Sequence, residues 1–433
     1  MIFFRTILAT VGVLLYTSLF SQYNVRFTQQ KTFDVKELQG DFKQMVKVME
    51  LHPARYVFTS EAEFEKIIKD SYEKITAPMT LGEFFDLCSG VISNIRCGHT
   101  GLEMPDKFWN KGDRPVFPLH MSIVNDSLIV TGDFNADIVR STHIVKINGK
   151  SFDEIVNGMR NYISSDGFNQ TWKIGRLNER LSSFLSIYFN FPTEYEIGYR
   201  TREGSEKSAR LQAVKNGELK AVLQKNDPLT YKVLDGKTAL MGIYSFNYYR
   251  KDTVTFFQMI NKFFGQVESD NIQNLIVDLR GNSGGDPFCA AHLLSYLAKT
   301  SFLYYAERYE WCPNLSKPIT PKAKAFNGNL YILTDGLCFS TTGHLAALLK
   351  VNKIGIIVGD ETGGTYTCND SGKWFELTNT GLKLRMAQQS FKVAAESLPR
   401  ERGVLPDFSI RPYSDEILRE KDVVLEYALS LTN

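Results

Sequence analysis

Apolar residues along the first hundred positions recur every three or four residues, which is the spacing of one face of a helix. This spacing predicts three amphipathic helices, over Asp34–His52, Glu61–Ile75 and Leu81–Ile95. We expect them to form a helical subdomain that spans residues 22–105. The subdomain ends in a turn, Arg96–Gly101, in which two glycines flank a histidine.

Over residues 106–214 the pattern changes to short segments in which apolar and polar residues alternate, as they do in half-buried strands. The pair Asn148-Gly149 is a strong signal for a tight turn. The strand-like segments are Met121–Val124, Ser127–Thr131, His143–Ile147 and Glu194–Thr201, and a helix is expected over Phe152–Ile163. The region therefore predicts a small β-rich domain with one or two helices.

From residue 230 to 433, short apolar runs alternate with segments of helical spacing. Three runs, Thr238–Tyr244, Asn274–Arg280 and Leu330–Thr334, have the continuous apolar character of strands buried on both faces. A helix over Thr253–Val267 separates the first two. This alternation predicts an α/β core.

Two segments of this core carry candidate chemistry. The second strand runs into the glycine loop Gly281–Gly285, and the third delivers Ser340 just before a helical pattern. A serine at a helix start lies beside N–H groups that no helical carbonyl engages, where an attacking oxygen and an oxyanion are stabilised. The same serine can act only as a helix cap, and the loop can be only a tight turn. Nucleotide binding is disfavoured, because no Lys-Ser/Thr follows the loop and GxGxxG is absent.

Composition excludes some classes of function. The formal net charge of +2 gives no electrostatic reason to expect nucleic acid as a partner. The six cysteines are too dispersed for a disulfide framework, although one or two bridges are compatible with an oxidising compartment. No CxxC pair and no HExxH motif occurs, so a zinc site has little support.

The amino terminus has the pattern of a secretory signal peptide. Arg5 precedes an apolar run over Ile7–Phe20, which the small polar residue Ser21 follows. The run is short for a membrane span and suits the apolar region of a signal peptide. We expect a signal peptide over residues 1–21 and export to the periplasm or the extracellular space. A membrane-anchored form with an uncleaved segment is the rival expectation.

Four motifs follow one another in the core: Asn274–Gly285, Leu333–Thr342, Ile357–Gly364 and Gly403–Asp407. Together they resemble the S41 peptidases, the family of C-terminal processing proteases and the tricorn core. The resemblance implies a ClpP/crotonase-like α/β core over 230–433 and a PDZ-like insert over 106–214. It also implies a serine endopeptidase that cleaves peptide or protein substrates through an acyl-enzyme, with C-terminal or unfolded segments as candidate substrates.

The resemblance assigns Ser340 as the nucleophile. Gly284, Gly285 and Thr341 match the segments that provide the N–H donors of the oxyanion hole in this family. A serine peptidase of this kind needs no metal or organic cofactor.

The general base separates two branches of the family. The processing-protease branch uses a lysine that would fall on Thr365, which cannot be a base, and Lys373 beyond it is expected in a later strand. The tricorn-like branch uses a histidine at the position of His99 and a glutamate near the last motif. The chain is therefore more similar to the Ser/His branch, with His99 as the base and Glu401 as its orienting partner. Glu396 is the rival for that partner.

Some features favour other interpretations. His344 lies one turn after Ser340 on the same helix and is an alternative base. Gly98 stands where the tricorn-like branch has a serine, and Gly343 stands where relatives often carry an acidic residue. These departures keep open a catalytically inactive protein that captures extended peptides by adding them to the edge of a sheet.

Overall fold

The computed structural model describes residues 30–110, 114–132, 138–201, 204–216, 218, 227–411 and 421–432. The expected signal peptide, residues 1–21, lies outside the described residues. Within them, no helix combines the length and the apolar character that crossing a membrane requires.

The first part of the described chain is helical, as the spacing predicts. Its helices are α1 (Val35–Met49), α2 (Glu61–Tyr72) and α3 (Leu81–Ile92), followed by the 3₁₀ turn η1 (Ser93–Ile95). Asp34 and Thr80 close capping boxes at the starts of α1 and α3, which satisfies N–H groups that the helices leave free. A short antiparallel pair, β1 (Thr32–Phe33) and β2 (Met79–Thr80), places the residues before α1 beside the residues before α3.

The middle region holds an antiparallel sheet in the order β10-β9-β7-β6-β5, with β8 paired to β7. Its strands are β5 (Met121–Val124), β6 (Ser127–Val130), β7 (His143–Ile147), β8 (Lys150–Ser151), β9 (Glu194–Arg200) and β10 (Glu206–Gln212). A separate short pair joins β4 (Pro115–Val116) to β11 (Val214–Lys215), and helix α4 (Asp106–Asn110) precedes it. The strands that the alternating pattern predicts are confirmed.

The helix content of this region differs from the expectation of one or two helices. The structure has α5 (Phe152–Met159), the 3₁₀ turn η2 (Arg160–Tyr162), α6 (Thr171–Glu179) and α7 (Leu181–Tyr188). Gln170 and Arg180, which directly precede α6 and α7, make no capping hydrogen bond, while Asn169 Oδ1 accepts from the Trp172 N–H at 2.8 Å in the first turn of α6. The helical spacing of α6 and α7 is carried by Trp172, Leu177, Leu181 and Leu185, which are buried.

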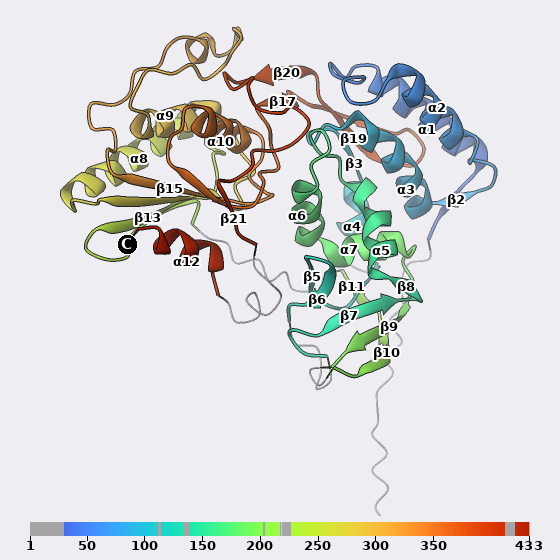
Figure 1. Ribbon diagram of the computed structural model, residues 1–433. Coiled ribbons are helices and arrows are strands. Elements are labelled where there is room, and N and C mark those ends of the chain that lie inside the picture. Colours follow the sequence, from blue (N-terminus) through green and yellow to red (C-terminus); the bar gives the residue numbers. More distant parts are fainter. Residues whose placement is uncertain are drawn as a thin grey trace, which may run out of the picture.

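The core is a sheet in the order β12-β13-β14-β15-β16-β21, parallel except for the β12–β13 pair. Its strands are β12 (Leu229–Val233), β13 (Thr238–Ile243), β14 (Asn274–Asp278), β15 (Asn329–Thr334), β16 (Ile356–Gly359) and β21 (Phe408–Ser409). Helices α8 (Lys251–Ser269), α9 (Pro287–Leu297) and α10 (Thr341–Val351) cover one face, and α12 (Val423–Ser430) covers the other (Figure 1). A 3₁₀ turn, η3 (Pro313–Ser316), lies between α9 and β15.

After β16 the chain leaves the core and returns to it. It forms β17 (Thr367–Asp370), β18 (Lys373–Glu376), β19 (Lys383–Met386) and β20 (Gln389–Lys392). Strand β17 pairs with β20, while β18 and β19 form a sheet with β3 (Gly101–Glu103). Strand β3 directly follows the turn that holds the candidate base. The segment from β17 to β20 therefore connects that turn to the core (Figure 1). Lys373 begins β18, as expected.

All six cysteines are buried and unpaired in the structure. None of the bridges that the cysteine count leaves open is formed.

Candidate active site

Ser340 lies between the end of β15 and the first turn of α10. Its backbone has φ 54° and ψ −123°, a combination that non-glycine residues rarely adopt. The serine side chain makes no capping hydrogen bond to the helix that it precedes. The plain helix-cap interpretation of Ser340 is therefore not supported, and the strained backbone is what holds the hydroxyl away from the helix.

The structure brings His99 to Ser340. The Nε2 atom of His99 lies 3.1 Å from the Ser340 hydroxyl oxygen, although the two residues are 241 positions apart. Phe339 packs against the imidazole with ring centroids 4.6 Å apart and stacks on Trp172 at 3.8 Å. Burial lowers the pKa of His99 to about 4, against the opposing effect of Asp370. The ring is thus neutral at pH 7 and can accept a proton.

Asp370, which the sequence motifs do not indicate, supplies the carboxylate beside the base. Its Oδ2 lies 3.6 Å from His99 Nε2. Arg385 donates to Asp370 Oδ1 at 2.5 Å and to the His99 carbonyl at 2.6 Å. Burial alone would raise the pKa of Asp370, but His99 and Arg385 together lower it. A charged carboxylate therefore faces the nitrogen that would take the proton from Ser340.

The other ring nitrogen of His99 faces a thiol. Nδ1 lies 3.7 Å from Cys368 Sγ. Burial raises the pKa of Cys368 well above its ordinary value, so this group stays a neutral thiol. In a Ser-His-Asp triad an acidic side chain occupies this position.

The structure does not bring Glu401 or Glu396 to the imidazole, which corrects the expected partner of the base. The Glu401 side chain is exposed, and its carbonyl accepts from the Phe168 N–H at 2.8 Å. Glu396 forms an ion pair with Lys392. The physical reason is the packing of the backbone. A Cβ on Gly167 would lie 2.3 Å from the Glu401 carbonyl oxygen, so the main chain of Glu401 packs against Gly167 while its side chain is exposed.

Of the three candidate oxyanion residues, Gly284 lies against Ser340, Thr341 follows it in the chain, and Gly285 contacts Thr341. A Cβ on Gly284 would lie 2.9 Å from both Ser340 Cβ and Thr341 N, so only glycine allows this approach. The Gly284 N–H already donates to Asn282 Oδ1 at 2.9 Å. The Thr341 N–H lies in the first turn of α10, where no helical carbonyl can accept it.

Gly285 provides the second available donor. The N–H groups on either side of it are engaged, by Asn282 Oδ1 and by the Phe246 carbonyl. Gly285 itself is paired with Phe246 as in a parallel ladder, so its own N–H points to the opposite side. Its carbonyl accepts from Thr341 Oγ1 at 2.5 Å, which fixes the loop against the start of α10. Gly285 and Thr341 are thus the pair that can hold an oxyanion.

Gly98 and Gly343 are both closely packed. A Cβ on Gly98 would lie 2.5 Å from Phe339 Cζ, and one on Gly343 would lie 2.7 Å from Gly364 Cα. A side chain at either position would require its neighbours to shift. The Gly98 N–H donates to the buried Asp166 Oδ1 at 2.8 Å, which holds the turn that carries His99.

The alternative bases do not reach the nucleophile. His344 is 2% exposed, and neither of its ring nitrogens bonds to a described residue. Burial and the neighbouring His99 lower its pKa to about 3. The Thr365 hydroxyl donates to the Thr367 carbonyl at 2.9 Å, and Lys373 is exposed. Across the described ranges, no group of three or more His, Cys, Asp or Glu side chains could hold a metal ion.

A cavity of about 460 Å³ opens beside His99. It lies between α6 and α7 on one side and β3 and β18 on the other, and its lining includes Trp172, Arg176, Phe184, Trp374 and Arg385. This volume is ordinary for a ligand site. The cavity can therefore accept a segment of a substrate next to the serine.

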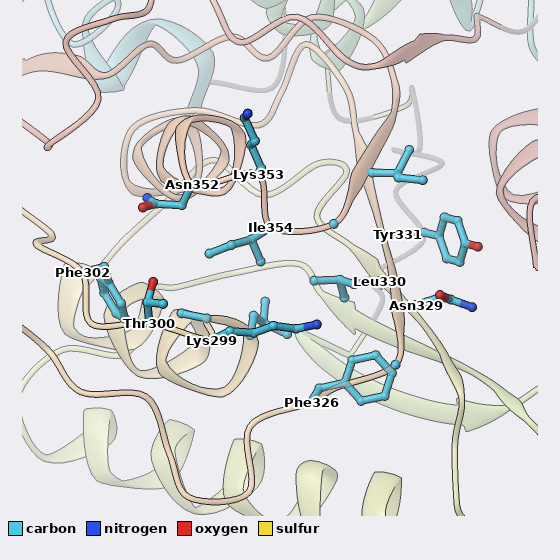
Figure 2. A pocket seen from close by; sticks show the side chains of 15 residues that line it. Lys299, Thr300, Phe302, Phe326, Asn329, Leu330, Tyr331, Asn352, Lys353 and Ile354 are labelled. Atoms are coloured by element: carbon cyan, nitrogen blue, oxygen red, sulfur yellow. The ribbon is translucent and has the colours of Figure 1, made fainter.

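A second cavity, of about 490 Å³, lies at the amino-terminal ends of the core strands β15 and β16 (Figure 2). Lys299, Phe302, Phe326, Asn329 and Lys353 are among the residues that line it. Ser340 follows the opposite end of β15, so this cavity is separate from the candidate active site.

The core of the chain is similar to a known family of peptidases. Residues 237–410 match the model of Peptidase family S41. No curated protein matches the chain.

Solved structures match nearly the whole chain. Mature CPAF matches with a TM-score of 0.64 and 12% identity, over 91% of this chain and 96% of that chain. Mature CPAF complexed with lactacystin matches with a TM-score of 0.66 and 12% identity, over 92% and 98%. The photosystem II D1 C-terminal processing protease gives 0.44 and 13% identity, over 88% and 96%. The match to CPAF confirms the expected α/β fold, while the PDZ-like character of the insert stays a prediction.

The low pKa of His99 predicts an unusual acid limb of the pH–activity profile. Because the protonated ring cannot act as a base, turnover should rise with pH through about 4 and should be flat from about 5 to 7. An ordinary imidazole would place the rise near pH 6.5. Steady-state kinetics on a fluorogenic peptide, with folding checked by circular dichroism at each pH, measures the midpoint. A midpoint at 6 to 7 would contradict a desolvated base.

Proposed function

We propose that this serine peptidase, whose residues 237–410 match family S41, hydrolyses peptide bonds through an acyl-enzyme formed on Ser340. The observation that carries the proposal is the 3.1 Å contact between Ser340 Oγ and a neutral His99 Nε2. The cavity that opens beside His99 supports a peptide or protein as the substrate.

The geometry supports the following steps. Ser340 attacks the scissile carbonyl and His99 Nε2 takes its proton. The Gly285 and Thr341 N–H groups hold the oxyanion of the tetrahedral intermediate. The negative charge of Asp370 stabilises the imidazolium, which then protonates the leaving amine. Water, deprotonated by His99, attacks the acyl-enzyme and releases the second product.

This mechanism is closer to the Ser/His branch of the family than to the Ser/Lys branch. Two observations support that inference: a histidine contacts the nucleophile, and the position of the family lysine holds Thr365. The role that the Ser/His branch gives to a glutamate is assigned here to Asp370.

We further propose that the protein is exported and acts on C-terminal or unfolded segments of proteins, in the periplasm or outside the cell. The apolar run Ile7–Phe20 supports export. The β-rich insert supports capture of an extended segment, because β10 is a terminal strand of its sheet with an exposed outer face.

Export predicts a mature chain that begins near Gln22. Mass spectrometry of the protein isolated from its native host should find an amino terminus at this position in the soluble exported fraction. An intact terminus in the membrane fraction would replace this proposal by the anchored form.

The serine mechanism predicts labelling of the chain by a fluorophosphonate probe at Ser340. Ser340→Ala should abolish labelling and lower turnover about a thousandfold or more, while the fold remains, because the change removes one oxygen. Labelling is followed by gel fluorescence and peptide mapping, and folding by circular dichroism. If the native chain is not labelled and has no peptidase activity, the protein is a peptide-binding relative without catalysis.

The assignment of Asp370 predicts a contrast between two carboxylate variants. Asp370→Asn should lower kcat on the order of a hundredfold, because the imidazolium loses its only described carboxylate neighbour. Glu401→Gln is the matched control and should leave kcat within about twofold, because its side chain is exposed and does not contact His99. Kinetics on both variants decides between them. A large loss in Glu401→Gln with an active Asp370→Asn would restore the glutamate as the partner of the base.

A further inference from the structure

The cavity beside His99 borders the base rather than the nucleophile. Its lining includes Gly98 and His99. Ser340, Gly285 and Thr341, which hold the reacting carbonyl in the proposed mechanism, do not line it. The cavity therefore lies to one side of the bond that is cut, and that side decides which part of a substrate it receives.

The proposed mechanism fixes which substrate residue lies beside His99. The imidazolium gives its proton to the leaving amine, so the nitrogen of that amine comes within hydrogen-bond distance of Nε2. This nitrogen belongs to the residue that follows the scissile bond, and the side chain of that residue is attached to the neighbouring Cα. The first residue after the scissile bond is thus the part of the substrate nearest to the cavity.

The wall of the cavity is aromatic and largely buried. The ring of Tyr162 lies against those of Phe85 and Phe184, with centroids 5.3 and 6.0 Å apart. Trp172 stacks on Phe339, the ring that supports the imidazole. Phe85, Tyr162 and Trp172 are buried, so neighbouring side chains hold them in place. A ring that enters the cavity can pack edge-to-face or offset against this wall, which adds to the gain from its burial.

The charged side chains of the lining give no reason to prefer a charged substrate residue. Three of them already pair with an opposite charge: Arg176 with Glu179, Asp106 with Lys383, and Arg385 with Asp370. Two others, Glu103 and Arg180, are exposed and opposite in sign. A charged side chain that entered the cavity would lose water without gaining a buried partner.

We propose that this cavity is the subsite for the first substrate residue after the scissile bond, and that it selects a large aromatic side chain there. The inference rests on the proposed function, since it needs an acyl-enzyme on Ser340 and an amine that leaves beside His99. The cavity, of about 460 Å³, has more room than a small side chain fills. Alanine would leave the apolar wall in contact with water, whereas phenylalanine or tyrosine would cover it.

Two neighbours on α7 control the size of the subsite. Ser183 and Phe184 both line the cavity, and both are half-buried. Loss of the ring at Phe184 removes a packing partner for the incoming side chain. A large ring in place of Ser183 fills the space that this side chain would occupy. The two changes alter the cavity in opposite ways, yet both should weaken the selection of an aromatic residue.

Acyl transfer measures this subsite directly. A peptide p-nitrophenyl ester acylates Ser340 and releases p-nitrophenol, so no amino-acid residue occupies the leaving side. The amine of an added amino-acid amide then attacks the acyl carbon. Its proton passes to His99 and on to Ser340 Oγ as the acyl C–O bond breaks, and a new peptide bond forms. This step is the reverse of acylation by a peptide, so the acceptor binds where the leaving residue lies.

The native chain should transfer its acyl group to phenylalaninamide in a saturable manner. At equal concentration this transfer should exceed transfer to alaninamide or lysinamide by about tenfold or more. Mass spectrometry measures the transferred and the hydrolysed products.

Phe184→Ala and Ser183→Trp should each lower the ratio of phenylalaninamide to alaninamide transfer by about fivefold or more. Phe257→Ala, which removes a half-buried ring from α8, is the matched control and should keep the native ratio. Each ratio is taken within one variant, so a general loss of activity does not change it.

Equal transfer to phenylalaninamide and alaninamide, or a ratio that neither variant lowers, would overturn the subsite alone. The same holds if the two variants alter the preference for the acyl-side residue of the ester and leave the acceptor ratio unchanged, because the cavity would then serve the other side of the scissile bond. A native chain that releases no p-nitrophenol and takes no fluorophosphonate label would overturn the proposed function, and the subsite with it.

Discussion

The close approach of main-chain segments around Ser340 is the constraint on which the site depends. Gly284 lies against Ser340 and Thr341, and a Cβ on Gly364 would lie 2.9 Å from the Ser340 N atom. Only segments without side chains can come this near. Their packing surrounds Ser340, whose backbone has φ 54°. The strain at Ser340 is thus maintained by the surrounding glycines.

His99, the proposed base, is positioned by three parts of the chain that are far apart in sequence. Asp166 of the insert bonds to the Gly98 N–H, and Arg385 of β19 bonds to the His99 carbonyl. The pairing of β3 with β19 further connects the His99 turn to the segment from β17 to β20. Phe339, next to the nucleophile, supports the face of the imidazole. The distance between the His99 ring and the Ser340 hydroxyl therefore depends on the insert and on the segment from β17 to β20 as much as on the core.

Much of the core and of the nucleophile's surroundings could be predicted from the sequence, because those signals are local. Buried parallel strands read as continuous apolar runs, and the glycine loop and the serine turn have characteristic residues at fixed offsets. Asp370 and Arg385 could not be found in this way, since their place depends on a hairpin that pairs with β3 near the other end of the chain. Glu401 was misassigned because a motif gives a residue's position in the chain but not the side to which its side chain turns. Helix α7 was missed because only Arg180, which makes no capping hydrogen bond, separates it from α6, whereas α6 does have a start signal in Asn169.

The central claim is that Ser340, His99 and the Gly285 and Thr341 N–H groups act on one tetrahedral intermediate. A crystal structure of the protein inhibited by a peptidyl phosphonate, which mimics that intermediate, tests it most directly. The account predicts a covalent bond from Ser340 Oγ to phosphorus and a phosphonyl oxygen within about 3.1 Å of both N–H groups. It also predicts that His99 Nε2 lies within hydrogen-bond distance of Oγ or of the leaving-group position. An adduct on another residue, or a phosphonyl oxygen turned to solvent away from both N–H groups, would contradict it.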